Sequence, residues 1–140
     1  MSGTEQKKQV GIVLVTHGNY GQSLLDAAQS ILGRQPGCGA VGVDISLEVG
    51  EILANIREAV QKSDLGGGVL ILTDMFGGTP TNLSLSLLGT GKLEVMTGVN
   101  LPMLVKLARI RADFDIKKAV AAASEAGRKY INVASETLGG

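Results

Sequence analysis

Apolar residues follow two different spacings along this chain, and each change of spacing predicts a change of secondary structure. Short, nearly unbroken runs of Val, Ile and Leu are typical of strands that are buried on both faces of a parallel sheet. Apolar residues that recur every three or four positions are typical of amphipathic helices. The short apolar runs predict strands at Val10–Thr16, Ala40–Ile45, Val69–Thr73 and Leu93–Thr97.

Each predicted strand is followed by a segment with helical spacing. The first helix is predicted over Gln22–Leu32, and Gly33 supplies a C-terminal stop. Four strand–helix units joined by right-handed crossovers predict an α/β fold, with an open, doubly wound, mostly parallel sheet and helices on both faces. No linker or repeat interrupts the pattern, so residues 1–140 are expected to form a single domain. The later helices are marked by Ile52, Leu53, Ile56, Ala59 and Val60, by Leu83, Leu87 and Leu88, by the residues after Asn100 and Pro102, and by Ile116, Ala119, Val120 and Ala123.

Charge and composition exclude several classes of partner. The 140 residues carry 13 basic and 13 acidic side chains, and the basic ones are scattered, so nucleic acid is not an expected partner. The polar N-terminal stretch precedes an apolar run that is too short for a signal-peptide core or a membrane span. We therefore predict a cytoplasmic protein without membrane insertion. Cys38 is the only cysteine, which excludes an internal disulfide.

Two polar residues, His17 and Asp74, directly follow predicted strands. Parallel α/β sheets bind ligands beyond the carboxyl ends of the strands, where the strand order reverses. His17 is the only histidine, and it lies near Asp74 if the first and third strands are neighbours. A carboxylate that accepts a hydrogen bond from one ring nitrogen fixes the tautomer and leaves the other nitrogen as a nucleophile. We predict a catalytic His17–Asp74 pair, although a lone histidine is also a common surface residue.

The turn after Asp74 contains Gly77, Gly78 and Thr79, and Pro80 suits the first turn of the next helix behind a Thr79 cap. Backbone N–H groups exposed in such a turn form an anion-binding concavity beside the positive end of the helix dipole. We predict phosphate binding at Gly77, Gly78 and Thr79. The same pattern also fits an ordinary strand-to-helix turn.

The same residues disfavour nucleotide-dependent and metal-dependent functions. No Lys follows the glycines, as a Walker loop requires, and no GxGxxG follows the first strand. One His and one Asp are too few for a closed zinc site, and no G-x-S-x-G elbow is present for serine hydrolysis. No metal or cofactor is expected, and these parts are sufficient for a phosphohistidine intermediate.

Three segments together are similar to a known family. GIVLVTHGNYGQSLLDAA, LILTDMFGGTPTNLS and VMTGVNLPMLVKL resemble the mannose-family IIA domains of bacterial sugar phosphotransferase systems, and the likeness extends along nearly the whole chain. The resemblance implies a phosphotransferase that accepts a phosphoryl group on His17 from the histidine phosphocarrier protein and passes it to a IIB component for sugar uptake. It assigns Asp74 to positioning the histidine, and Gly77, Gly78 and Thr79 to the turn around the phosphate.

The resemblance also implies a homodimer that exchanges a C-terminal strand between subunits. Tyr130–Val133 is the candidate segment, and its sequence equally allows an edge strand in the sheet of its own subunit. We expect no Ala/Pro-rich linker or IIB domain fused to the chain, so the IIB component is expected either to be a separate polypeptide or to be missing.

Other functions of the same fold stay open on the sequence alone. A regulatory phosphoprotein would use the phosphoryl group as a signal, because it adds roughly two negative charges near neutral pH. The phosphoryl-transfer subunit of a dihydroxyacetone kinase also resembles this chain and uses a histidine after its first strand. A small anion-binding domain would bind phosphate without covalent chemistry.

Three further side chains have two interpretations each. Phe76 either contacts partners at the rim of the site or covers the core. Asn100 either caps its helix or lines the pocket, and Tyr20 either flanks the site or covers the first helix.

Overall fold

The protein is described by a computed structural model that covers residues 8–139. Within this range strands and helices alternate up to β4, as the apolar spacing predicts, and the chain then continues through helices. The elements are β1 Gly11–His17, α1 Tyr20–Leu32, β2 Cys38–Val43, α2 Val49–Ser63, β3 Val69–Thr73, α3 Thr79–Leu85, β4 Leu93–Met96, α4 Leu101–Ile110, α5 Ile116–Lys129 and α6 Ala134–Thr137.

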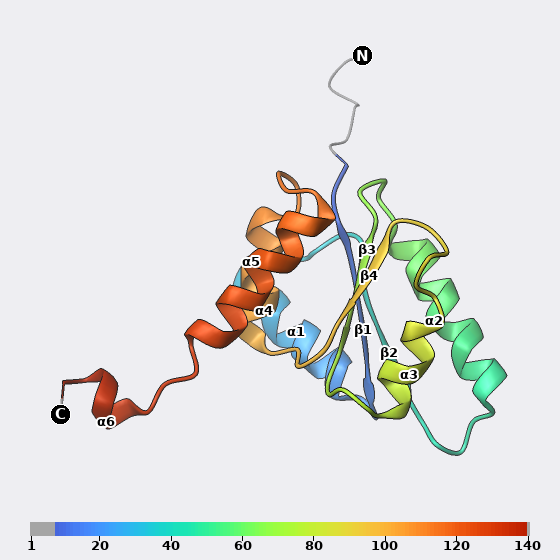
Figure 1. The fold of residues 1–140 in the computed structure, drawn as a ribbon, viewed down its shortest axis with the longest axis horizontal. Helices are drawn as coiled ribbons and strands as arrows, with labels where there is room; N and C mark the ends of the chain where they lie inside the picture. Colours follow the sequence, from blue (N-terminus) through green and yellow to red (C-terminus); the bar gives the residue numbers. More distant parts are fainter. Residues whose placement is uncertain (1–7, 140) are drawn as a thin grey trace, which may run out of the picture.

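The strands of this range form one parallel sheet with the order β2-β1-β3-β4 (Figure 1). The chain moves outward from β1 to β2 and then returns to the opposite side of β1 to form β3. The strand order therefore reverses between β1 and β3, which is where parallel α/β sheets bind ligands. The predicted open, doubly wound sheet is confirmed.

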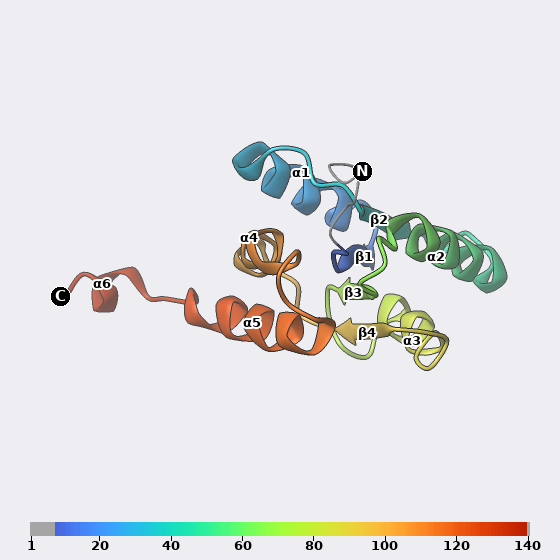
Figure 2. The same ribbon diagram turned by 90° about the horizontal axis from the view of Figure 1, so that it is seen from above.

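Helices cover both faces of the sheet, and this explains why the strand sequences lack polar alternation. Figure 2 shows α1, α4 and α5 on one face and α2 and α3 on the other. From β1, Ile12 and Leu14 pack toward the first group of helices, whereas Val13 and Val15 pack toward the second. Each such buried side chain contributes roughly 1.5–3 kcal/mol of hydrophobic free energy. β1 is therefore held from both sides, and its carboxyl end is a fixed platform.

The helices of residues 8–139 are too short or too polar to cross a lipid bilayer. One of them is also shorter than predicted, because α3 ends at Leu85 rather than near Leu88. The chain continues in tighter turns, in which the N–H of Leu87 donates to the carbonyl of Ser84 at 3.0 Å and that of Leu88 donates to Leu85 at 3.1 Å. Leu87 is still buried by these turns.

The prediction of an edge strand at Tyr130–Val133 in the subunit's own sheet is wrong. α5 runs to Lys129, and the chain then leaves the body of the molecule without joining the sheet (Figure 1). Ile131 is 77% exposed and Val133 is 60% exposed. A strand needs a neighbouring strand to satisfy its backbone groups, and the path of the chain away from β4 provides none. Exchange of this segment with a second subunit stays a prediction.

Arg111, which directly follows α4, fastens this helix to the amino ends of β1 and β2. Its side chain is buried, and its guanidinium donates to the carbonyl of Val10 at 3.4 Å, to the sulfur of Cys38 at 3.1 Å and to the carbonyl of Pro36. The backbone carbonyl of Arg111 accepts a further hydrogen bond from the N–H of Val10 at 3.1 Å. Burial raises the pKa of the Cys38 thiol and outweighs the opposing effect of Arg111, so Cys38 has the environment of a structural thiol.

Replacement of Arg111 by Met should lower the free energy of unfolding by roughly 2–4 kcal/mol, because buried carbonyls lose their donors. Urea unfolding followed by circular dichroism measures this loss. Arg109→Met is the matched control, since Arg109 is exposed on the same helix and its loss should cost less than about 0.5 kcal/mol. Equal stabilities of the two variants would contradict the assigned role of Arg111.

Candidate functional site

His17 and Asp74 are held together at the carboxyl ends of β1 and β3. One carboxylate oxygen of Asp74, Oδ2, lies 2.7 Å from Nδ1 of His17. The same oxygen accepts a hydrogen bond from the backbone N–H of His17 at 2.9 Å. The expectation that neighbouring strands bring these two residues together is confirmed. The imidazole stays 50% exposed, whereas the side chain of Asp74 is 16% exposed. The pair is therefore held by the mostly buried Asp74, whereas the ring of His17 is open to solvent.

The charge of Asp74 fixes which nitrogen of the ring holds the proton. Partial burial, the largest single influence, raises the pKa of Asp74, but hydrogen bonds from His17 and from the N–H of Met75 outweigh it and lower the pKa below its ordinary value. An ionised carboxylate only accepts hydrogen bonds, so Nδ1 of His17 must donate. In the neutral imidazole the lone pair is then on Nε2.

Gly78 lies against the ring edge that carries this lone pair. A Cβ atom on Gly78 would be 2.9 Å from Cε1 of His17 and 3.2 Å from Nε2, which is closer than a side chain tolerates. Gly77 has φ +90°, a left-handed conformation that favours glycine, and it turns the chain toward α3. The two glycines thus bring the backbone of the turn next to Nε2.

The turn leaves backbone donors free beside His17. Among the described residues, no group accepts a hydrogen bond from the N–H of Gly77, Gly78 or Thr79. The hydroxyl of Thr79 is on an exposed residue and forms no hydrogen bond within the same range. An anion-binding turn needs such free donors, so phosphate binding at Gly77, Gly78 and Thr79 stays a prediction.

The prediction that Thr79 caps α3 is wrong. The helix begins at Thr79 itself, and Gly78 is the N-cap, with no side-chain hydrogen bond. The physical reason is that the carbonyl of Gly78 already accepts the first helical hydrogen bond, from the N–H of Asn82 at 3.0 Å. Pro80 still falls in the first turn of the helix, as predicted.

The structure decides the position of three further side chains, Asn100, Phe76 and Tyr20. Asn100 caps α4, because its Oδ1 accepts from the N–H of Met103 at 3.1 Å. Phe76 is 72% exposed, so its interpretation as a cover for the core is wrong. Tyr20 is half-exposed, and its hydroxyl donates to the carbonyl of Val99 at 3.4 Å.

Three buried threonines at the site were not predicted from the sequence. Thr16 and Thr73 each precede a site residue, and Thr81 lies in the first turn of α3. Thr16 accepts a hydrogen bond from the N–H of Gly21 at 2.7 Å, and the hydroxyls of Thr73 and Thr81 are 2.6 Å apart. A hydroxyl at the end of each apolar strand was the only signal in the sequence for this arrangement.

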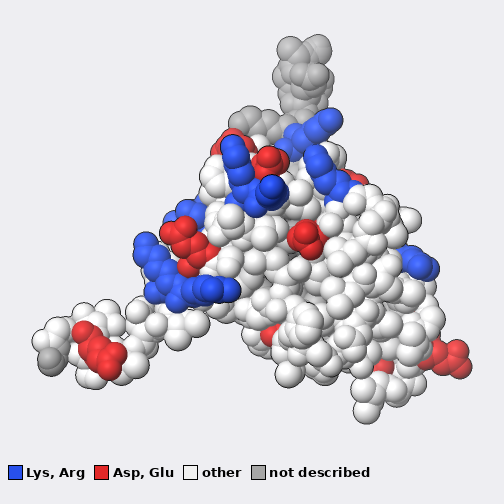
Figure 3. Space-filling view, viewed as in Figure 1, with Lys and Arg blue, Asp and Glu red and all other residues white. Residues whose placement is uncertain are grey.

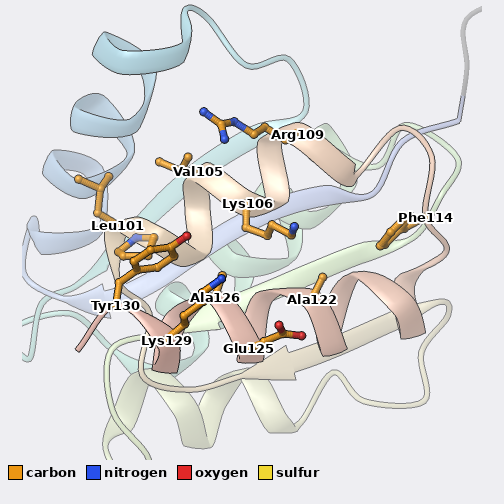
Figure 4. A pocket seen from close by; sticks show the side chains of 11 residues that line it. Leu101, Val105, Lys106, Arg109, Phe114, Ala122, Glu125, Ala126, Lys129 and Tyr130 are labelled. Carbon is orange, nitrogen blue, oxygen red and sulfur yellow. The ribbon is translucent and has the colours of Figure 1, made fainter. Parts of the chain in front are cut away.

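A groove between α4 and α5 is separate from the candidate site. Its volume is about 580 Å³ (Figure 4). Neither His17 nor Asp74 lines it. No three His, Cys, Asp or Glu side chains within residues 8–139 gather closely enough to hold a metal ion. The residues that line the groove include the apolar Leu101, Val105 and Phe114 and the charged Lys106, Arg109, Glu125 and Lys129.

Fold and site together define an open parallel α/β protein whose exposed histidine is oriented by an aspartate at the switch point of the sheet. Residues 11–124 match the family model described as the PTS system fructose IIA component, EIIA-man. The chain belongs to this mannose-type family of IIA components of the sugar phosphotransferase system (PTS).

Individual relatives agree with this assignment. The chain is 35% identical over 126 residues to the PTS system mannose-specific EIIAB component of Escherichia coli K12, an alignment that covers 87% of this chain and 38% of that protein. It is 33% identical over 98 residues to the transcriptional regulatory protein LevR of Bacillus subtilis, covering 69% of this chain and 10% of LevR. The crystal structure of EIIA from Streptococcus agalactiae superposes with a TM-score of 0.82 at 25% identity, over 91% of this chain and 98% of that one. The chain thus spans less than half of the first two relatives.

The Asp74–His17 contact predicts a pH dependence of stability. A carboxyl group whose pKa is lowered by folding contributes stability above its unfolded pKa, near 3.8, and loses it as the pH falls through the lower folded value. Between pH 7 and pH 3 the wild type should therefore lose more unfolding free energy than Asp74→Asn. Urea titrations at both pH values measure the difference, and Asp26→Asn on the exposed face of α1 controls for net charge. Parallel losses in the wild type and Asp74→Asn would refute the contact.

Proposed function

We propose that His17 carries a phosphoryl group, which it accepts from the phosphohistidine of the phosphocarrier protein and passes to a histidine of a IIB component. The observation that carries this proposal is the geometry of the ring. Asp74 holds Nδ1, and Nε2 faces the glycine turn at an exposed strand end. Membership of the IIA family supports a phosphoryl carrier in sugar uptake.

The transfer is a displacement between two nitrogens. The lone pair of Nε2 attacks phosphorus, and the bond from phosphorus to the donor nitrogen breaks, so that its electron pair returns to the donor ring. The proton on Nδ1 stays in place, because the carboxylate of Asp74 accepts its hydrogen bond and stabilises the positive charge that the ring acquires. The reverse sequence at Nε2 delivers the phosphoryl group to IIB.

The glycine turn stabilises the charge of the group in transit. The phosphoryl oxygens are bound by the free N–H groups of Gly77, Gly78 and Thr79 and by the hydroxyl of Thr79. Donors that are already in position when charge develops lower the barrier more than flexible side chains do. The close approach of Gly78 to the imidazole brings these donors within reach of Nε2.

The surface around His17 suits repeated contact with other proteins. Met75 and Phe76 are 58% and 72% exposed beside the pair. Figure 3 shows few charged side chains near the lower edge of the molecule, where the strands end, and more of them toward the top and over α5. A rim that is apolar and weakly charged allows two different partners to dock in turn. We assign Phe76 to this contact.

We also propose the setting in which the carrier acts. It is a cytoplasmic domain that forms a homodimer, and residues 130–133 pair with the exposed edge of β4 in the second subunit. The exposure of Ile131 and Val133 supports this exchange, since more than half of each side chain is open to solvent in a single subunit.

A regulatory role is the second candidate function. The similarity to a segment of the transcriptional regulatory protein LevR favours it. In that case the charge of the phosphoryl group at His17 would change how a partner docks, without onward transfer.

Phosphorylation of the purified protein tests the proposal directly. After incubation with phosphoenolpyruvate, enzyme I and the phosphocarrier protein, intact mass spectrometry should find one acid-labile phosphoryl group on the wild type and none on His17→Ala. Addition of a IIB component should remove the label from a relay protein and leave it on a regulatory one. The proposal would be contradicted if the folded wild type acquired no phosphoryl group from donors that phosphorylate another IIA domain.

A further inference from the structure

We propose that Thr81 is a positioning residue for His17, because its buried hydroxyl joins Thr73 to the carbonyl of Met75 and so holds the turn that carries Asp74 and Gly78. This inference rests on the proposed function of His17. The hydroxyl of Thr81 bonds to neither His17 nor Asp74, and it acts through the backbone of the turn.

The hydrogen bonds around Thr81 form a chain with one direction. Its Oγ1 donates to the carbonyl of Met75 at 2.6 Å and lies 2.6 Å from Oγ1 of Thr73. A hydroxyl has a single proton, so Thr81 must accept from Thr73 while it donates to Met75. Both threonine side chains are completely buried, and each bond is therefore expensive to lose.

The hydrogen bonds of Thr81 join two residues that flank Asp74, namely Thr73 and Met75. Thr73 is the last residue of β3, and its own carbonyl accepts from the N–H of Val99 at 3.0 Å. Met75 follows Asp74 and donates its N–H to Oδ1 of that carboxylate at 3.0 Å. Met75 is thus held on both sides, by Asp74 through its N–H and by Thr81 through its carbonyl. This leaves Oδ2 of Asp74 directed at His17.

Thr81 also links the two halves of the turn. It belongs to the first turn of α3, whose N-cap is Gly78, and it reaches back to the residue after Asp74. The seven-residue segment from Asp74 to Pro80 is thereby closed at its base. Without this bond the carboxylate and the glycine turn could move independently, although both must lie against the same imidazole.

Threonine is favoured here over an apolar residue of the same shape. Valine fills the same volume but leaves the Met75 carbonyl and the Thr73 hydroxyl without their partner. Serine keeps the hydroxyl and loses only a methyl group. The pair of variants therefore separates the hydrogen bonds of Thr81 from its packing.

The first readout is the tautomer of His17 in the protein without phosphate, which needs no partner protein. Long-range ¹H–¹⁵N correlation spectra are unambiguous, because the chain has one histidine. We expect the neutral ring to hold its proton on Nδ1 in the wild type and in Thr81→Ser, and to become a mixture of tautomers in Thr81→Val. The second readout is the rate of phosphorylation, which should fall about ten- to a hundredfold in Thr81→Val at saturating phosphocarrier protein. The half-saturating concentration should change less than the rate, since the variant removes no side chain of the docking rim.

Ser84→Ala is the matched control. Its buried hydroxyl donates to the carbonyl of Pro80 at 2.7 Å in the same helix, but the bond does not reach Asp74 or Met75. Thr73→Val breaks the outer bond alone, so a smaller shift of tautomer is expected, and it provides the test if Thr81→Val does not fold. The role of Thr81 would be overturned if a folded Thr81→Val variant kept the tautomer and the phosphorylation rate of the wild type. It would also be overturned if Ser84→Ala changed the tautomer and the rate as much as Thr81→Val does. Absence of labelling in every variant, including the wild type, would instead reject the proposed function and leave the tautomer result to decide on Thr81.

Discussion

The parallel pairing of β1 with β3 is the contact on which the rest of the site depends. Val15 is paired with Thr73, so the residues that end the two strands fall side by side at one edge of the sheet. Because the strand order reverses at this place, the loops after β1 and β3 turn to opposite faces and leave His17 accessible between them. Asp74 then accepts two hydrogen bonds from His17, and the ring has one orientation. The buried apolar runs of the two strands fix this geometry, since a slip by one residue would exchange the side chains that pack into the cores on the two faces of the sheet.

The reactivity of the site follows from the different environments of the two nitrogens of the imidazole. Nδ1 is committed to a carboxylate whose pKa is lowered by the hydrogen bonds that it accepts, and Nε2 is left facing the backbone of Gly78. The proposed transfer needs no deep cavity, because the phosphoryl group would arrive bound to another protein. An open edge and an exposed Phe76 fit this exchange better than the groove between α4 and α5 does.

Much of this arrangement could be predicted from the sequence, and the exceptions share a cause. The β1 and β3 runs are apolar without interruption, which identifies a sheet covered on both faces, and His17 and Asp74 directly follow those runs. The Thr79 cap was wrong because Gly78 and Thr79 are both acceptable N-caps, and only the helical hydrogen bond to Gly78 decides between them. Tyr130–Val133 has strand-forming residues, but a strand also requires a neighbour, which local sequence does not specify. Thr73 and Thr81 were missed because their contact spans a turn and depends on how that turn folds.

The central claim is that Asp74 leaves Nε2 of His17 as the nitrogen that is phosphorylated. The most direct test is the nuclear magnetic resonance spectrum of ¹⁵N-labelled protein after phosphorylation by the phosphocarrier protein, in which coupling between ³¹P and ¹⁵N identifies the bonded nitrogen. We expect coupling to Nε2, with Nδ1 still protonated and hydrogen-bonded to Asp74. Coupling to Nδ1 would contradict the claim, because the phosphoryl group would then occupy the position that the structure gives to the Asp74 carboxylate.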